Sequence, residues 1–287
     1  MTQLQHHTIT GADGVALHAV EAGNPAGPPI LFVHGWSQGA GVWRKQLASP
    51  LLTSRFRMVA LDLRGHGESA ADGAAYGDAR AWAGDLAATI DALGLRGAVL
   101  AGWSYGGYVI NDYLRAYGED AIRGIVYVAA AVDMGVDVAY RQRGDGWRGV
   151  LPRRGTSEPH AFSGAPHDAG PMRTFVRNCF AGALAQADED ELLAINLRVA
   201  PAVRQALFAR TVASDDVLAA IRVPVIVAHG TGDRIVDAET ARHIAALVPH
   251  ARLSLYADCG HALFWEAPAA FERELAGFVD VAAGALR

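Results

Sequence analysis

The chain has 287 residues, of which 51% are hydrophobic and 19% are charged, and its formal net charge at pH 7 is −5. This composition is too apolar for a disordered chain, and the length suits one large domain or a core with an insertion. The mildly acidic balance lacks the basic footprint of nucleic-acid-binding proteins, so we expect no nucleic-acid partner.

Cysteine usage and hydropathy bear on the cellular compartment. Cys179 and Cys259 cannot build a disulfide framework, and we expect both to be free thiols in a reducing compartment. Residues 1–14 are polar and contain no apolar signal-peptide segment. No stretch approaches the ~18 consecutive apolar residues of a membrane helix. We therefore expect a soluble, cytoplasmic protein with no membrane partner.

Short apolar segments rich in β-branched residues predict six strands. Because they are almost continuously apolar, they are typical of strands buried on both faces, as in a parallel sheet covered by helices. In chain order the predicted strands are Pro29–Val33, Phe56–Leu61, Ala98–Ala101, Gly124–Ala129, Pro224–Ala228 and Ala251–Tyr256.

Segments with helical periodicity alternate with these strands. From Ala79 to Leu93 apolar side chains recur every three or four residues, and Gly94 ends the pattern. Helices are also expected at Tyr105–Tyr117 and Ala238–Leu247, each after a strand. The alternation predicts an α/β fold with a mostly parallel, doubly wound sheet.

Residues 133–213 interrupt this alternation, since they contain no convincing strand. A loop rich in Gly, Arg and Pro, Arg141–Gly170, comes first, and three helical patterns follow it at Met172–Leu184, Asp188–Arg198 and Pro201–Arg210. An insertion at this point lies over the carboxyl ends of the strands, where open α/β sheets bind ligands. We therefore expect a core formed by residues 1–132 and 214–287, with a helical cap at 133–213.

The segment Gly102-Trp103-Ser104-Tyr105-Gly106 fits G-x-S-x-G and lies between a predicted strand and a predicted helix. In this setting the serine is a nucleophile on a strained turn, and the glycines avoid collisions with neighbouring backbone. The motif by itself also fits an ordinary Gly-rich loop. The strand-turn-helix context favours Ser104 as a catalytic nucleophile.

A serine nucleophile needs a base and an acid that orients the base. His261 follows the last predicted strand and is the predicted base. Asp233 follows the strand Pro224–Ala228 and is the predicted acid, while Asp133 is the alternative. Asp62 is instead expected to hold its own loop together with Arg64.

Acyl chemistry also needs N–H donors for the developing oxyanion. The backbone N–H of Tyr105, the residue after the nucleophile, is one predicted donor. The other is the N–H of Trp36, in the loop after the first predicted strand. The aromatic and aliphatic residues of the predicted cap are interpreted mainly as helix core, with one or two lining an acyl pocket; they are Phe162, Met172, Phe175, Phe180 and Leu184.

Five motifs together resemble the α/β-hydrolase fold family, in its order and over nearly the whole chain outside the predicted cap. Within that family the chain is similar to the serine-nucleophile branch of cofactor-free haloperoxidases and arylesterases. The motifs are FVHGW (32–36), LDLRGHGES (61–69), AGWSYGG (101–107), HGTGD (229–233) and CGHALFWEAP (259–268).

The resemblance implies the fold, the triad Ser104, Asp233 and His261, and an oxyanion hole formed by the amides of Trp36 and Tyr105. It departs from the pattern at Asp237, where that branch often has proline, and in the predicted cap. Because the turn holds a serine, the aspartate-nucleophile chemistry of haloalkane dehalogenases and epoxide hydrolases is disfavoured. The resemblance also implies a monomer or a homodimer.

The hypothesis from the sequence is a serine hydrolase that cleaves small-molecule carboxylic esters, with small to medium acyl groups, through an acyl-enzyme intermediate. One alternative is the same triad used for C–C bond hydrolysis, acyl transfer, lyase or cyclase chemistry; others are a perhydrolase or haloperoxidase-type side activity, or a non-catalytic binding protein. The chain has no P-loop, no H-E-x-x-H and no cysteine cluster, so the sequence implies neither a cofactor nor a metal.

Overall fold

The computed structural model describes residues 4–71, 75–153, 158–163 and 169–284. Within these residues one eight-stranded sheet has the order β1-β2-β4-β3-β5-β6-β7-β8. β2 is antiparallel to both neighbours, and all pairings from β4 to β8 are parallel. The strands are β1 (Gln5–Thr10), β2 (Ala16–Gly23), β3 (Pro29–Val33), β4 (Arg57–Asp62), β5 (Ala98–Trp103), β6 (Ile122–Val128), β7 (Val225–Gly230) and β8 (Arg252–Tyr256).

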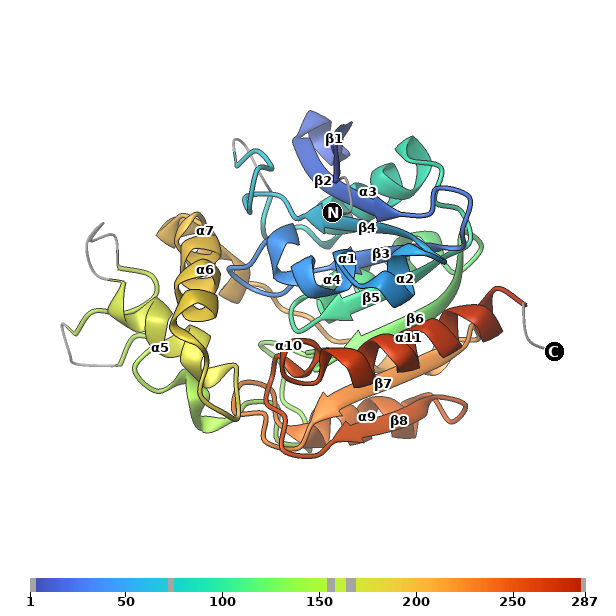
Figure 1. Ribbon diagram of the computed structural model, residues 1–287. Coiled ribbons are helices and arrows are strands. Elements are labelled where there is room, and N and C mark those ends of the chain that lie inside the picture. The colour runs from blue at the N-terminus through green and yellow to red at the C-terminus, as the bar shows by residue number, and fades with distance from the viewer. Residues whose placement is uncertain (1–3, 72–74, 154–157, 164–168, 285–287) are drawn as a thin grey trace.

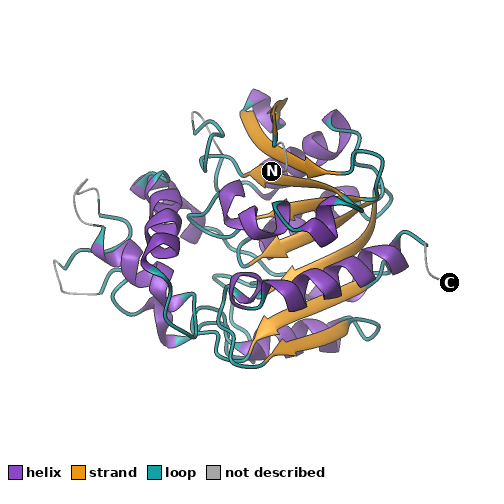
Figure 2. Cartoon of the chain, viewed as in Figure 1, coloured by secondary structure: helices purple, strands orange, loops and turns teal. Residues whose placement is uncertain are grey.

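Helices cover both faces of the sheet (Figures 1 and 2). One group packs together on one face and consists of α1 (Arg44–Leu47), α2 (Pro50–Thr53), α10 (Leu263–Glu266) and α11 (Pro268–Ala282). The other group consists of α3 (Ala79–Ala92), α4 (Gly106–Tyr117), α8 (Asp215–Ala220) and α9 (Ala238–Leu247). Two of these helices begin at aspartate caps, because Asp78 accepts from the N–H of Arg80 and Asp237 from that of Glu239.

The predicted fold class is confirmed, since the six predicted strands correspond to β3–β8 with ends shifted by only a few residues. β1 and β2 were not predicted. His18 and Glu21 interrupt the apolar pattern of β2, and only the fold supplies their partners Asp62 and Arg57. α11 was also not predicted, although its buried side chains Phe271, Leu275, Phe278 and Val279 have helical spacing.

The described part of residues 133–213 includes a group of helices beside one end of the sheet (Figure 1). The helices are α5 (Gly170–Asn178), α6 (Gln186–Leu197) and α7 (Pro201–Phe208), so the first ends before its predicted limit at Leu184. Reciprocal backbone hydrogen bonds between Met134 and Val212, 2.8 and 2.9 Å long, join the two ends of this segment. Parts of the predicted loop Arg141–Gly170, at 154–157 and 164–168, lie outside the described residues.

No helix of the described residues combines the length and the apolar character needed to cross a membrane.

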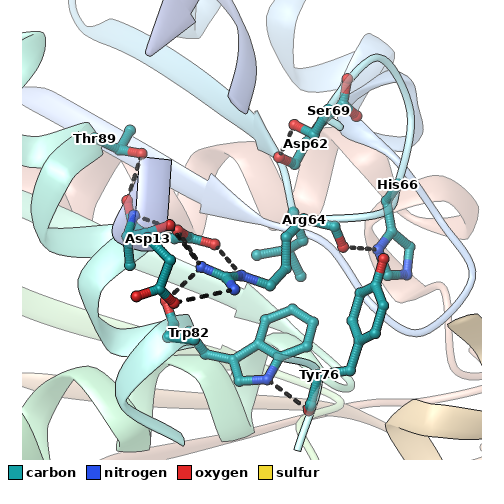
Figure 3. A network of polar contacts seen from close by, with 12 residues as sticks. Asp13, Asp62, Arg64, His66, Ser69, Tyr76, Trp82 and Thr89 are labelled. Atoms are coloured by element: carbon teal, nitrogen blue, oxygen red, sulfur yellow. Dashed lines mark hydrogen bonds and ion pairs between the residues drawn. The ribbon is translucent and has the colours of Figure 1, made fainter. Parts of the chain in front are cut away.

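A buried ion pair organises the loop after β4 (Figure 3). Arg64 donates from Nε and Nη2 to the carboxylate of Asp85 in α3, over 2.6 and 2.8 Å. Both side chains are almost fully buried, and burial raises the pKa of Asp85 above its ordinary value even though Arg64 lowers it. Asp62 holds this loop as expected, by accepting from the N–H groups of Ala40 and Glu68, and Figure 3 draws it in the same polar network as Arg64.

Arg64→Met is expected to destabilise the protein by about 3–5 kcal/mol, because it leaves the Asp85 carboxylate buried without its counter-ion. The free energy of unfolding from urea titration measures this loss. The double variant Arg64→Met/Asp85→Leu removes both charges, and we expect it to be more stable than the single variant. A double variant as unstable as Arg64→Met would contradict the ion-pair interpretation.

Candidate active site

The residues predicted for catalysis lie beyond the carboxyl ends of parallel strands. Ser104 directly follows β5, and Trp36 lies in the loop after the neighbouring β3. Asp233 follows β7, and His261 follows β8, which is the outermost strand of the sheet. This edge of an open α/β sheet is where such folds place their ligands.

Ser104 adopts a left-handed backbone conformation with φ of 55°. Such a conformation is strained for a residue with a side chain, typically by about 1–3 kcal/mol. Its carbonyl accepts hydrogen bonds from the N–H groups of Gly107 and Ala131, at 2.9 and 3.0 Å, and its own N–H donates to Val128. These bonds hold the strained turn between β5 and α4.

The glycines of the motif allow other backbone to approach this turn. A Cβ atom at Gly106 would lie 2.6 Å from the carbonyl oxygen of Val33, at the end of β3. A Cβ atom at Gly102 would lie 2.5 Å from the Ile110 side chain and 2.9 Å from the Gly106 carbonyl oxygen. Both positions therefore require glycine, as the sequence pattern indicated.

His261 and Asp233 form a buried pair. Nδ1 of His261 lies 2.7 Å from Oδ2 of Asp233, and neither side chain is exposed. Oδ1 of Asp233 accepts from the N–H groups of Ile235 and Val236, at 2.8 and 3.0 Å. Burial raises the pKa of Asp233, but the charge and hydrogen bonds of its histidine neighbours outweigh that effect and hold the pKa below its ordinary value.

The structure separates the two candidate acids. Asp133 uses one carboxylate oxygen to accept from the N–H of Ser214, at 2.8 Å, and the other to accept from the hydroxyl of Tyr140, at 2.7 Å. Neither oxygen bonds to His261. Asp233 is therefore the acid that pairs with the predicted base.

No hydrogen bond joins Ser104 to His261 among the described residues. Nε2 of His261 has no hydrogen-bond partner among them either, although it is buried. Catalytic hydrogen bonds are often long or poorly aligned in ligand-free enzymes and tighten when substrate binds. With Nδ1 directed to Asp233, Nε2 is the ring nitrogen that remains to accept a proton.

Two residues that the sequence did not single out position this pair. His229 is completely buried at the end of β7, and its Nε2 lies 3.2 Å from Oδ2 of Asp233. The indole N–H of Trp103 donates to the backbone carbonyl of His261 over 2.9 Å, and the two rings lie 5.3 Å apart. Both belong to the quoted motifs, but only the fold shows which groups they contact.

One predicted oxyanion donor, Tyr105, belongs to the strained turn, and the other, Trp36, belongs to the loop after β3. Gly35 is so close to the turn that a Cβ atom there would lie 3.0 Å from Cβ of Ser104. Tyr105 is the N-cap residue of α4, where N–H groups point out of the helix and favour negative charge. Among the described residues, the backbone N–H groups of Trp36 and Tyr105 have no hydrogen-bond acceptor.

The Trp36 side chain connects this loop to residues 133–213. Its indole N–H donates to the carbonyl of Arg204 in α7 over 3.0 Å. Its ring meets four aromatic rings edge-on, with centroids 5.0–6.4 Å away: those of Trp147, Phe162, Phe175 and Phe208. Such edge-to-face pairs are favoured by the ring quadrupoles.

A cavity lies between the sheet and this insertion, with Ser104 in its wall. The volume of this cavity is about 40 Å³. Trp36, Trp147 and Phe208 form part of its apolar wall. The five aromatic and aliphatic residues expected to include one or two pocket residues are absent from its lining, so that expectation is wrong. Phe162 and Phe175 instead pack against the ring of Trp36, and Phe180 packs against that of Trp265.

Comparisons with known proteins identify the family. The family model of the alpha/beta hydrolase fold matches residues 28–268. A non-heme haloperoxidase from Rhodococcus erythropolis is 31% identical over 89% of this chain and 92% of its own length. A non-heme chloroperoxidase from Streptomyces lividans is 30% identical over 95% of this chain and 99% of its own length.

Solved structures agree with this assignment. A protein described as an aryl esterase from Burkholderia cenocepacia has a TM-score of 0.85 and 35% identity, over 98% of this chain and all of its own. An esterase from a Rhodococcus species has a TM-score of 0.87 and 34% identity, over 96% of this chain and 98% of its own. The chain therefore belongs to the α/β-hydrolase fold family and is an enzyme of the hydrolase type, similar to haloperoxidases and aryl esterases.

Proposed function

We propose that the protein is a serine hydrolase that cleaves carboxylic esters through an acyl-enzyme intermediate. The observation that carries this proposal is the position of Ser104, on a strained turn in the cavity wall, with the pair His261–Asp233 beyond strands of the same sheet edge. Similarity to proteins described as esterases, at 34–35% identity, supports it.

In the proposed first step, Oγ of Ser104 attacks the ester carbonyl carbon while Nε2 of His261 takes the hydroxyl proton. The carbonyl π electrons move to its oxygen, which the N–H groups of Trp36 and Tyr105 stabilise. When the C–O bond to the alcohol breaks, His261 returns the proton to the leaving alkoxide. Water then attacks the acyl-enzyme with the same groups, which releases the acid and restores Ser104.

In this mechanism Asp233 keeps His261 in one tautomer and orientation and stabilises the imidazolium ion that forms. Its low pKa keeps the carboxylate ionised while His261 gains and loses its proton. His229 supports this role, because its Nε2 reaches the carboxylate oxygen that also accepts from His261.

We also propose that residues 133–213 act as a cap over the site. Trp147 and Phe208 of this segment line the cavity together with Ser104. A space of about 40 Å³ accommodates only a few water-sized groups. The cap therefore favours esters with a small acyl group.

A second candidate reaction is transfer of the acyl group to hydrogen peroxide instead of water. A bifunctional esterase/perhydrolase from Acinetobacter calcoaceticus is 28% identical over 94% of this chain and 98% of its own length, which favours testing this reaction. It would use the same acyl-enzyme, with peroxide as the attacking nucleophile, and would release a peracid.

Ser104→Ala is expected to lower kcat for p-nitrophenyl acetate on the order of 10⁶-fold while leaving the fold intact, because the nucleophile is lost. Ser54→Ala, at an exposed serine in the turn after α2, is the matched control and should retain activity. Initial rates and circular dichroism of the three proteins provide the measurement. Undiminished hydrolysis by a folded Ser104→Ala variant would exclude Ser104 as the nucleophile.

Across p-nitrophenyl esters from acetate to laurate, kcat/KM is expected to fall steeply beyond short acyl chains, because the cavity is small and walled by aromatic rings. A preference for long chains would contradict the proposed cap. If no ester is hydrolysed but a fluorophosphonate still labels Ser104, the triad serves one of the other reactions, such as C–C bond cleavage or acyl transfer.

The acid side of the pH profile is expected to follow the titration of at most one group, because Asp233 does not titrate there. Asp233 stays ionised in this range because its pKa is held below its ordinary value. A plot of log kcat/KM between about pH 5 and 8 should therefore not exceed a slope of one, whereas a slope of two would show that a second group titrates.

A further inference from the structure

The mouth of the catalytic cavity opens beside an arginine-rich hollow. Arg143 and Trp147 line both the cavity that contains Ser104 and a larger surface hollow. The volume of this hollow is about 940 Å³. Arg141, Arg148 and Arg153 also line this hollow.

The local charge is opposite to that of the whole chain. Residues 141–153 contain four arginines and one acidic residue, Asp145, in a protein with a net charge of −5. The carboxylate of Asp145 forms an ion pair outside this segment, with Nε of Arg234 at 3.0 Å. A positive hollow beside a cavity raises the local concentration of anions and steers them toward the opening.

Two of these arginines have no ion-pair or hydrogen-bond partner in the part of the chain that the structure describes. Arg141 pairs with Asp237 at 2.9 Å. The guanidinium groups of Arg143 and Arg148, in contrast, make no ion pair or hydrogen bond with the described residues. The Arg143 guanidinium lies 5.2 Å from the centre of the Phe208 ring, in the cavity wall. Arg143 therefore lies in the cavity wall with no acceptor for its N–H donors among the described residues.

Inside the cavity, two polar side chains in the wall also lack partners. Among the described residues, Oγ1 of Thr240 and Nε2 of Gln142 have no hydrogen bond, although both atoms are buried. Thr240 as a whole is only 1% exposed. Unsatisfied buried donors are unfavourable, so a hydrogen bond from either group to a ligand oxygen would be stabilising.

Asp133 also lies in the cavity wall, but its negative charge is not directed at the arginine-rich hollow. Both of its carboxylate oxygens accept hydrogen bonds, from the N–H of Ser214 and from the hydroxyl of Tyr140. It is 5% exposed and is absent from the lining of the arginine-rich hollow.

We propose that the preferred substrate is an ester with an anionic substituent, a carboxylate or a phosphate, that binds Arg143 and Arg148 while the ester group lies at Ser104. Thr240 and Gln142 bind an oxygen of the same substrate inside the cavity. This proposal rests on the proposed ester hydrolysis and specifies its substrate class.

The test compares matched charged and neutral esters. Monomethyl glutarate is paired with methyl valerate, and 2-phosphoethyl butyrate with 2-hydroxyethyl butyrate. We expect the wild-type kcat/KM to favour the charged member of one pair by about tenfold, as for a charge-assisted hydrogen bond. The pair that shows the preference identifies the anion. Equal kcat/KM values within both pairs would overturn the proposal.

Variants assign the preference to residues. Arg143→Gln is expected to reduce the charged-to-neutral ratio of kcat/KM about tenfold, mainly by raising KM for the charged ester. Arg96→Gln, at an exposed arginine before β5 with no ion pair among the described residues, is the matched control and should leave the ratio unchanged. Thr240→Val removes only the unpaired hydroxyl, so it should lower kcat/KM without lowering the melting temperature. A ratio unaffected by Arg143→Gln would refute the role of this residue.

A binding measurement separates this proposal from the proposed function. Glutarate and phosphate, each tested alone, should slow fluorophosphonate labelling of Ser104 in the wild type more than in Arg143→Gln. If neutral esters are hydrolysed in a Ser104-dependent way but neither anion slows labelling, only the anion site fails. If no ester is hydrolysed but an anion protects Ser104 in an Arg143-dependent way, ester hydrolysis fails and the anion site stands.

Discussion

The strained backbone at Ser104 is the constraint on which the rest of the site depends. A left-handed residue at the end of a buried strand persists only where its surroundings compensate for the strain. Here the Ser104 carbonyl accepts from the N–H groups of Gly107 and Ala131, and the Ser104 N–H donates to the carbonyl of Val128. The close approach of β3 then requires glycine at 106. The same approach brings the loop of Gly35 against the Ser104 side chain, so nucleophile and proposed oxyanion loop are positioned by one contact.

Hydrogen bonds join residues 133–213 to that loop. Arg204 of α7 donates to the hydroxyl of Ser37 and to the carbonyls of Ala161 and Asn196, and its own carbonyl accepts from Trp36. Burial without a carboxylate partner lowers its pKa to about 10. Since the loop and the insertion share these bonds, substitutions in α7 will alter both the shape of the cavity and the geometry of the proposed oxyanion donors.

The charges of the protein are arranged in two different ways around the cavity. On the core side, Asp233 is buried and ionised because two histidines and two backbone N–H groups stabilise its negative charge. On the solvent side, Arg143 and Arg148 are positive and have no protein partner among the described residues. The first arrangement suits proton transfer in a dry site, whereas the second suits recruitment of a charged molecule from water.

The sequence by itself determined the α/β fold and predicted the strands β3–β8, because continuous apolar runs and glycine-rich turns are local signals. It also indicated Ser104, Asp233 and His261 as candidates, and it favoured Asp233 over Asp133, in agreement with the observed His261–Asp233 pair. The polar interruptions in β2 hid that strand, since His18 and Glu21 are compensated by residues about 40 positions away, Asp62 and Arg57.

Only the tertiary structure decided what surrounds the proposed nucleophile. Phe162 and Phe175 pack against Trp36 outside the cavity, whereas Trp147, Phe208 and Thr240 line it. The contact between His229 and Asp233 and the position of Arg143 in the cavity wall are likewise visible only in the fold. The physical reason is that helical periodicity shows which residues are apolar, but the face that meets the core depends on long-range packing across the insertion.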